Sequence, residues 1–207
     1  MTELETIMNS GKIYQVMDLT AQDIHYSEYL QKMELYNSLG YTSKGEKAKQ
    51  SILKELFAEI GENSYIQAPY HAMWGGHHVH LGKNVYINFN CTFVDDAQIF
   101  IGDGTMIAPN VTIVAASHPV SPTLRAEGYG YNKPVTIGKN VWIASNVTIL
   151  PGVQIGDNSI IGAGSVVSKD IPSNVIAFGN PIKVHRTITA DDDIYYDHGK
   201  LISENIV

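Results

Sequence analysis

The chain has 207 residues, a formal net charge of −7 and a single cysteine, Cys91. This length suits one domain that buries its own core, and an acidic surface does not attract nucleic acid or an anionic membrane. The lone cysteine excludes an intramolecular disulfide and fits a reducing compartment. Neither a secretory pattern nor a stretch of the ~18 to 20 apolar residues that a membrane span needs is visible, so we expect a cytoplasmic protein.

Residues 1–60 are predicted to be mainly helical. An amphipathic pattern runs over residues 21–37, and Ser43 and Glu46 have the spacing of a capping box at the start of a second helix. Apolar residues then recur at helical intervals as far as Ile60. We therefore expect a helical N-terminal segment that ends near residue 60.

A six-residue period dominates the chain from about residue 79. Such a period suits neither an α-helix nor a flat strand, but it suits short strands that turn corners and point one aliphatic residue inward on each side of a prism. Coils stacked about 4.8 Å apart would then bury a continuous aliphatic column. An early run slips by two residues before it resumes, and a later run is unbroken. The early run is Leu81, Ile87, Phe93, Ile101, Ile107 and Ile113, and the later run is Ile137, Ile143, Ile149, Ile155, Ile161 and Val167.

Two segments depart from the column. Residues 114–136 lack the repeat and contain His118, and a long loop on a regular scaffold is usually functional or disordered. The last segment, 188–207, contains three consecutive aspartates that we expect to be solvated rather than to bind a metal. The chain thus divides into a helical segment at 1–60, a β-helix at 61–187 and a C-terminal tail at 188–207. Cys91 lies inside the β-helix at a small-residue position, so we expect a packed side chain rather than a catalytic thiol.

Four motifs occur in a fixed order along the repeats. They are Tyr-Ile-Asn-Phe-Asn at 86–90, Val-Asp-Asp at 94–96, His-Pro-Val at 118–120 and Gly-Lys-Asn-Val-Trp-Ile at 138–143. With these motifs the sequence resembles the galactoside and maltose O-acetyltransferases of the hexapeptide-repeat acyltransferases. The repeats alone indicate only the superfamily, whereas the Asn-Phe-Asn, Asp-Asp and His-Pro-Val elements are more specific.

The resemblance implies a mainly β fold, namely a left-handed parallel β-helix with a helical N-terminal segment and a long loop that interrupts the coils. It implies a homotrimer with active sites between neighbouring subunits. It also implies acetyl-CoA as the co-substrate, with no metal. The implied reaction is the direct transfer of an acetyl group to a hydroxyl of a small, sugar-like acceptor.

Acyl transfer to an alcohol needs a base for its proton and donors for the developing oxyanion. An imidazole can accept and release a proton near neutral pH, and the resemblance makes His118 the general base. It implies that Asn88 contacts the acceptor and helps to stabilise the transition state. Asp96 matches a position that accepts hydrogen bonds from acceptor hydroxyls.

The coenzyme is expected along the C-terminal coils. The resemblance assigns the pantetheine arm to backbone groups and short side chains, and the nucleotide phosphates to two basic residues. Lys183 keeps a positive charge where the family has arginine but loses the bidentate fork. The implied coenzyme contacts are Ser145, Ala163, Ser168 and Lys169 for the arm, Lys183 and Arg186 for the phosphates, and Trp142 as a wall of the groove.

The acceptor region departs from the family pattern. Met73 and Trp74 lie in a longer segment where the family has a serine, which predicts a lost hydrogen-bonding partner and added apolar surface. Val16, one residue before Met17 and Asp18, stands near the position of an acceptor-contacting aspartate. We therefore expect the catalytic groups to be retained, whereas specificity for galactosides or maltose does not follow.

Three alternatives remain at this stage. An acetyltransferase for an antibiotic or another xenobiotic alcohol would use the same histidine chemistry, and a β-helix that only binds or scaffolds would have no need of it. A zinc carbonic anhydrase on the same fold would take His118 as one of three ligands, and the chain offers His77, His78 and His80 nearby. No further histidine follows His118 at a suitable spacing, so we expect no metal.

Overall fold

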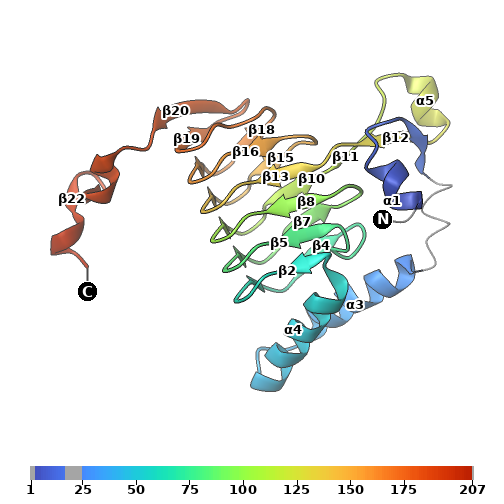
Figure 1. Cartoon of the computed structure of the whole chain (residues 1–207), viewed down its shortest axis with the longest axis horizontal. Helices are drawn as coiled ribbons and strands as arrows, with labels where there is room; N and C mark the ends of the chain where they lie inside the picture. The colour runs from blue at the N-terminus through green and yellow to red at the C-terminus, as the bar shows by residue number, and fades with distance from the viewer. Residues whose placement is uncertain (1–2, 17–24, 207) are drawn as a thin grey trace.

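Short strands wind around the three faces of a prism in the computed structural model, which describes residues 3–16 and 25–206 (Figure 1). The first face contains β2 (Glu59–Ile60), β5 (Val79–Leu81), β8 (Ile99–Ile101), β13 (Val135–Ile137) and β16 (Gln154–Ile155). The second contains β3 (Tyr65–Ile66), β6 (Tyr86–Ile87), β9 (Met106–Ile107), β14 (Trp142–Ile143), β17 (Ile160–Ile161), β19 (Val175–Phe178) and β20 (Lys183–Thr187). The third contains β4 (Tyr70–Ala72), β7 (Cys91–Val94), β10 (Thr112–Val114), β15 (Thr148–Ile149) and β18 (Val166–Val167). The predicted parallel β-helix is confirmed.

The core is the aliphatic column that the period predicts. On the first face Leu81, Ile101, Ile137 and Ile155 lie in register on successive strands, and all four side chains are buried. Each contributes about 1.5 to 3 kcal/mol by leaving water. Cys91 is buried in the same core, and burial raises the pKa of its thiol to about 11, so it is a packed, protonated side chain.

The β-helix begins earlier than the sequence predicts. The second long helix, α4 (Ser43–Leu56), ends before Ile60, and Ile60 pairs with Leu81 in the first coil. The apolar spacing of Ile60 fits both a helix and the column, and tertiary packing decides for the column.

The expected capping box is also wrong, because Thr42 rather than Ser43 caps α4 and accepts a hydrogen bond from the Gly45 N–H.

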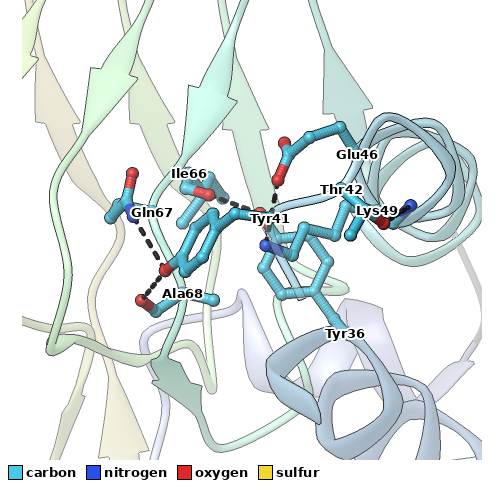
Figure 2. Close-up of polar contacts among 9 residues, drawn as sticks. Tyr36, Tyr41, Thr42, Glu46, Lys49, Ile66, Gln67 and Ala68 are labelled. Atoms are coloured by element: carbon cyan, nitrogen blue, oxygen red, sulfur yellow. Dashed lines mark hydrogen bonds and ion pairs between the residues drawn. The ribbon is translucent and has the colours of Figure 1, made fainter. Parts of the chain in front are cut away.

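The helices α3 (Tyr26–Ser38) and α4 close the base of the β-helix (Figure 1). The first coil has no coil beneath it, and polar side chains of the helical segment donate to its carbonyl oxygens instead. These donors are Tyr36 to Ile66, Asn37 to Tyr70, Tyr41 to Ala68 and Gln50 to Ser64. Figure 2 shows two of these contacts, from Tyr36 to Ile66 and from Tyr41 to Ala68. Lys49, fully buried among them, bonds to Glu46 at 3.2 Å and lies 3.9 Å from the ring centroid of Tyr41. The helical segment and the β-helix therefore share one core.

Asparagines in the left-handed region form most of the corner between the first and second faces, the first corner. Asn and Gly adopt this conformation at little cost, which explains their use at each turn. Side-chain amides bond between coils, from Asn63 to Asn84 at 3.1 Å and from Asn140 to Asn158 at 3.1 Å. Gly104, at φ +70°, interrupts this ladder between Asn84 and Asn140.

The corner between the third and first faces, the third corner, carries all the extra chain. The connections that follow Ala72, Val94 and Val114 exceed the six-residue period there, and they include the slip seen in the sequence. The longest is ordered as β11 (Ala116–Ser117), α5 (Pro122–Ala126) and β12 (Tyr129–Asn132). The N-terminal strand β1 (Tyr14–Gln15), which follows helix α1 (Glu3–Met8), pairs with β12 and completes a three-stranded antiparallel sheet.

The C-terminal tail stands away from the β-helix (Figure 1). It consists of the 3₁₀ turn η1 (Ala190–Asp193), the hairpin β21 (Tyr195–Tyr196) and β22 (Lys200–Leu201), and the 3₁₀ turn η2 (Ile202–Glu204). Asp192 of the acidic triplet accepts two hydrogen bonds from the guanidinium of Arg186, at 2.6 and 2.8 Å. Within residues 3–16 and 25–206, every helix is too short or too polar to cross a bilayer.

The interrupted ladder generates a stability prediction. Gly104→Asn should raise the free energy of unfolding, because an added Cβ meets no atom closer than 4.0 Å and the new amide is expected to link Asn84 to Asn140. We expect a gain of about 1 kcal/mol, from the added hydrogen bonds and the restricted unfolded chain. The control is Gly164→Asn, also left-handed and also open, at the corner between the second and third faces. Urea unfolding in which both variants change equally would contradict a role for the ladder.

Candidate active site

His118 leaves the column at the third corner, directly after β11, and its side chain is exposed. The imidazole Nδ1 lies 3.0 Å from the carbonyl oxygen of Tyr129 in β12. Because a carbonyl only accepts, Nδ1 must carry the hydrogen of the neutral ring, and Nε2 keeps its lone pair. The neutral ring is therefore oriented as a proton acceptor through Nε2.

Asp96 lies at the same corner and is 9% exposed. Its Oδ1 accepts a hydrogen bond from the indole N–H of Trp74 at 3.4 Å, whereas Oδ2 has no hydrogen-bond partner among the described residues. Burial raises the pKa of Asp96, and this rise is opposed by the Trp74 bond and by the nearby His78 and His118. Asp96 thus lies near His118, and a positive charge on the imidazole would favour the carboxylate form of Asp96.

Asp95, which sequence analysis did not single out, positions the turn that covers this corner. Its carboxylate accepts from the backbone N–H of Trp74 at 2.8 Å and of Gly76 at 3.1 Å, and its carbonyl oxygen lies 2.6 Å from His78 Nδ1. Burial raises the pKa of Asp95 to about 6, with a further rise from the neighbouring Asp96, and the backbone N–H groups of Trp74 and His78 partly offset this rise. The two aspartates therefore have different roles: Asp95 stabilises the turn, whereas Asp96 lies at the candidate site.

The sequence did not indicate Tyr14 and Asn132 as site residues either, because two residues so far apart in the chain form no local motif. Asn132 is buried, and its Nδ2 donates to the Tyr14 hydroxyl oxygen at 2.7 Å and to the Asp96 carbonyl oxygen at 2.8 Å. Strand pairing places Tyr14 opposite Gly130, next to the carbonyl that holds His118. The N-terminal strand therefore forms one wall of the site.

The residues that depart from the family pattern lie at this wall or beside it. The Val16 side chain lies so close to Gly130 that a Cβ at position 130 would collide with it. His118 Nδ1 lies 3.7 Å from the same Cβ position. Trp74 is buried and its indole N–H donates to Asp96, so this segment supplies a hydrogen-bond donor that the expected loss of a hydrogen-bonding partner did not include. Met73 is 48% exposed, and its sulfur accepts from the Tyr26 hydroxyl at 3.8 Å. Met17 and Asp18 lie outside the described residues.

The other site residues predicted from sequence lie at the second corner, on the second face and at the third corner of the prism. The residues at the corner between the second and third faces, the second corner, are Asn88, Ser145 and Ala163. On the second face itself lie Trp142, Lys183 and Arg186. Ser168 and Lys169 follow β18 at the third corner. His118 and Asp96 lie at the same corner, on coils nearer the base. Within one chain, the structure therefore does not bring Asn88 to His118.

The three histidines of the zinc alternative do not gather on one strand face. His80 Nε2 bonds to Gln98 at 2.6 Å, whereas His78 turns toward Asp95. Ligand atoms of His77 and His78 lie within 4.8 Å of each other and of Glu5 in α1. His77 also stacks on Tyr29 with ring centroids 4.2 Å apart. His118 is not part of this group, which is the only such cluster found among the described residues.

Comparisons with known proteins show the family to which the chain belongs. A family model described as bacterial transferase hexapeptide (six repeats) matches residues 134–169. A galactoside O-acetyltransferase of Lactococcus lactis is 52% identical over 175 residues, which cover 84% of either chain. The chain belongs to the galactoside O-acetyltransferase family. A second relative, the galactoside O-acetyltransferase of Escherichia coli, is also 52% identical, over 72% of either chain.

Solved structures of related acetyltransferases share the fold over nearly the whole chain. A galactoside acetyltransferase in complex with coenzyme A superposes with a TM-score of 0.87 at 41% identity and covers 98% of both chains. A maltose O-acetyltransferase from Clostridium difficile gives a TM-score of 0.84 at 39% identity, over 91% of this chain and 98% of that one. A hexapeptide-repeat acetyltransferase from Vibrio cholerae, complexed with acetyl-CoA, gives 0.80 at 30% identity, over 91% of this chain and 100% of that one.

The buried carboxylate of Asp95 generates a prediction about stability. Asp95→Ala should lower the free energy of unfolding by about 2 to 4 kcal/mol, because it leaves buried N–H groups of the turn without an acceptor. Asp157→Ala is the control, since Asp157 accepts one N–H bond, from Lys139, at an exposed corner, and its loss should cost less than about 1 kcal/mol.

The same variant tests the raised pKa. The ordinary value of 3.8 rises to about 6 in the folded state, so the folded chain binds this proton more tightly than the unfolded chain. The stability linked to this proton is present below about pH 4 and lost as the pH rises through about 6. The difference between wild type and Asp95→Ala in urea unfolding should therefore shrink between pH 5 and pH 7. A difference that grows with pH would contradict the assignment.

Proposed function

We propose that this chain is an acetyl-CoA-dependent O-acetyltransferase that acts on a hydroxyl of a small, sugar-like acceptor. The observation that carries the proposal is the oriented imidazole of His118, whose Nδ1 is held by a backbone carbonyl beside the buried carboxylate of Asp96. Membership of the galactoside O-acetyltransferase family supports the same chemistry. Two of the solved relatives hold coenzyme A or acetyl-CoA.

The proposed reaction is a direct transfer. His118 Nε2 takes the proton of the acceptor hydroxyl while the hydroxyl oxygen attacks the thioester carbonyl. The side-chain amide of Asn88 donates to the oxyanion that forms. Collapse of the tetrahedral intermediate breaks the carbon–sulfur bond, and the imidazolium returns the proton to the CoA thiolate. The products are an acetyl ester and free CoA.

We propose that each active site lies between two subunits of a homotrimer. His118 and Asp96 lie at the third corner, whereas Asn88 and the pantetheine residues Ser145 and Ala163 lie at the second. A neighbouring copy whose second corner meets the third corner of the first would complete the site. The outer surface of the second face supports this arrangement, because it exposes large apolar side chains in register. These are Tyr86, Met106 and Trp142, which are 39%, 50% and 48% exposed.

The coenzyme would follow the groove between the two subunits. Ser145, Ala163, Ser168 and Lys169 would meet the pantetheine arm, with Trp142 as a wall. Lys183 and Arg186 would meet the phosphates at the C-terminal end of the second face. The guanidinium of Arg186 is held by Asp192, so a phosphate bound there would share or replace that carboxylate.

The acceptor is expected to have an apolar part. Tyr26 meets Trp74 edge to face at 4.9 Å, and Val16 and the exposed Met73 lie beside the site. An apolar wall discriminates by only about 1 to 3 kcal/mol per methylene, so we expect broad use of glycosides with an apolar or aromatic aglycone. The absence of a bound metal and the cytoplasmic location stay predictions.

Loss of the base tests the mechanism. His118→Ala should lower kcat by about 10² to 10⁴, as expected for a general base, with little change in the affinity for acetyl-CoA. His198→Ala is the control, because His198 is an exposed histidine in the C-terminal tail. Release of free CoA thiol measures turnover. A His118→Ala enzyme within a few-fold of wild type would exclude the assignment.

Mixed subunits test the shared site. His118→Ala and Asn88→Ala should each be nearly inactive alone, since each lacks one half of every site. After joint unfolding and refolding, a mixture should regain activity well above either parent, because some sites receive His118 from one subunit and Asn88 from its neighbour. Sedimentation should give a trimer for both parents. A mixture no more active than its parents would place both residues in one subunit's site or refute the role of Asn88.

A further inference from the structure

Tyr14 faces the third corner without a role in the reaction described so far. Its strand, β1, pairs with β12, and β12 also supplies the Tyr129 carbonyl that orients His118. Asn132 Nδ2 lies 2.7 Å from the Tyr14 hydroxyl oxygen and 2.8 Å from the Asp96 carbonyl oxygen, so this amide holds Tyr14 next to Asp96. The phenol hydroxyl therefore lies in the same wall of the corner as the carbonyl that orients His118 and the backbone of Asp96.

The hydrogen bonds of Asn132 fix how this hydroxyl is used. An amide nitrogen has two hydrogens, and Asn132 directs one to the Tyr14 oxygen and the other to the Asp96 carbonyl oxygen. The Tyr14 oxygen is thus an acceptor in this pair, and its own hydrogen must point elsewhere. Burial raises the pKa of Tyr14 to about 12, which keeps that hydrogen in place over the working pH range.

Asp96 supplies the complementary group. Its Oδ2 is buried and has no donor among the described residues, and a buried acceptor left without a donor is costly. A hydroxyl group is both donor and acceptor, so a single hydroxyl can donate to Asp96 Oδ2 and accept from the Tyr14 O–H. Neither an amine cation nor an ether oxygen can make both bonds.

We propose that Tyr14 is an acceptor-binding residue that, together with Asp96, binds a second hydroxyl of the acceptor while His118 deprotonates the first. The enzyme would thus select polyhydroxylated acceptors over monohydric alcohols. Asn132 is the positioning residue, because its amide sets the direction of the Tyr14 O–H. This inference rests on the proposed acetyl transfer.

Tyr14→Phe tests the proposal with two acceptors that differ in hydroxyl number. A phenyl hexopyranoside offers several hydroxyls, whereas cyclohexylmethanol has only the one that would react. The variant should lose about tenfold in kcat/KM for the hexopyranoside, as expected for one hydrogen bond in a buried site. It should change less than about twofold for cyclohexylmethanol, and KM for acetyl-CoA should stay constant, because the missing contact belongs to the second hydroxyl.

The matched control is Tyr41→Phe, which removes a phenol hydroxyl at the helical base, where it bonds to Ala68. Its acceptor preference should equal that of wild type. The ratio of the two kcat/KM values does not depend on the fraction of folded enzyme, so partial unfolding of Tyr14→Phe cannot imitate the result. Equal losses on both acceptors, no loss on either, or a raised KM for acetyl-CoA would overturn the role of Tyr14. A wild-type enzyme that acetylates neither acceptor would instead overturn the proposed function and this inference with it.

Discussion

Strand pairing between coils constrains everything else in this molecule. Each coil must return to the register of the one below, because its backbone groups bond to that coil and its aliphatic side chains stack in one column. A residue added on a face would shift every later side chain by one position and turn apolar groups outward. Extra chain is tolerated only where a corner can bulge away from the column. In this protein the third corner takes all of it.

This constraint separates the scaffold from the chemistry. The second corner and the second face keep the strict period, and they carry Ser145, Ala163 and Trp142, to which the proposal assigns coenzyme contacts. The third corner carries turns of different lengths on successive coils, and these bring Trp74, Asp96 and His118 together. The proposed acceptor site therefore lies on the irregular edge of the prism, and the proposed trimer would bring that edge to the regular edge of a neighbour.

Periodicity made the fold predictable because each inward residue repeats the same environment. His118 could be predicted by its motif and by its place in a long interruption. The end of α4 could not, since Ile60 satisfies the helical and the six-residue spacing equally well. The sequence shows that two extra residues follow Phe93, but it does not show what they do. Asp95 and Asp96 have separate roles only because the turn that contains Trp74 and Gly76 packs against them. Tyr14 and Asn132 meet only through the pairing of β1 with β12, which leaves no local trace in the sequence.

The closed base of the prism has a consequence for the solution behaviour of the chain. A parallel β-helix ends in rows of unpaired backbone groups, and an identical molecule could dock onto them and extend the stack into a fibre. Here Tyr36, Asn37 and Tyr41 occupy the carbonyls of the first coil, and the buried Lys49 would be costly to carry into a continued stack. The helical segment thus acts as a terminator of polymerisation. At this end of the prism an added copy finds no free row of strand carbonyls, which leaves the sides of the prism available for the proposed trimer.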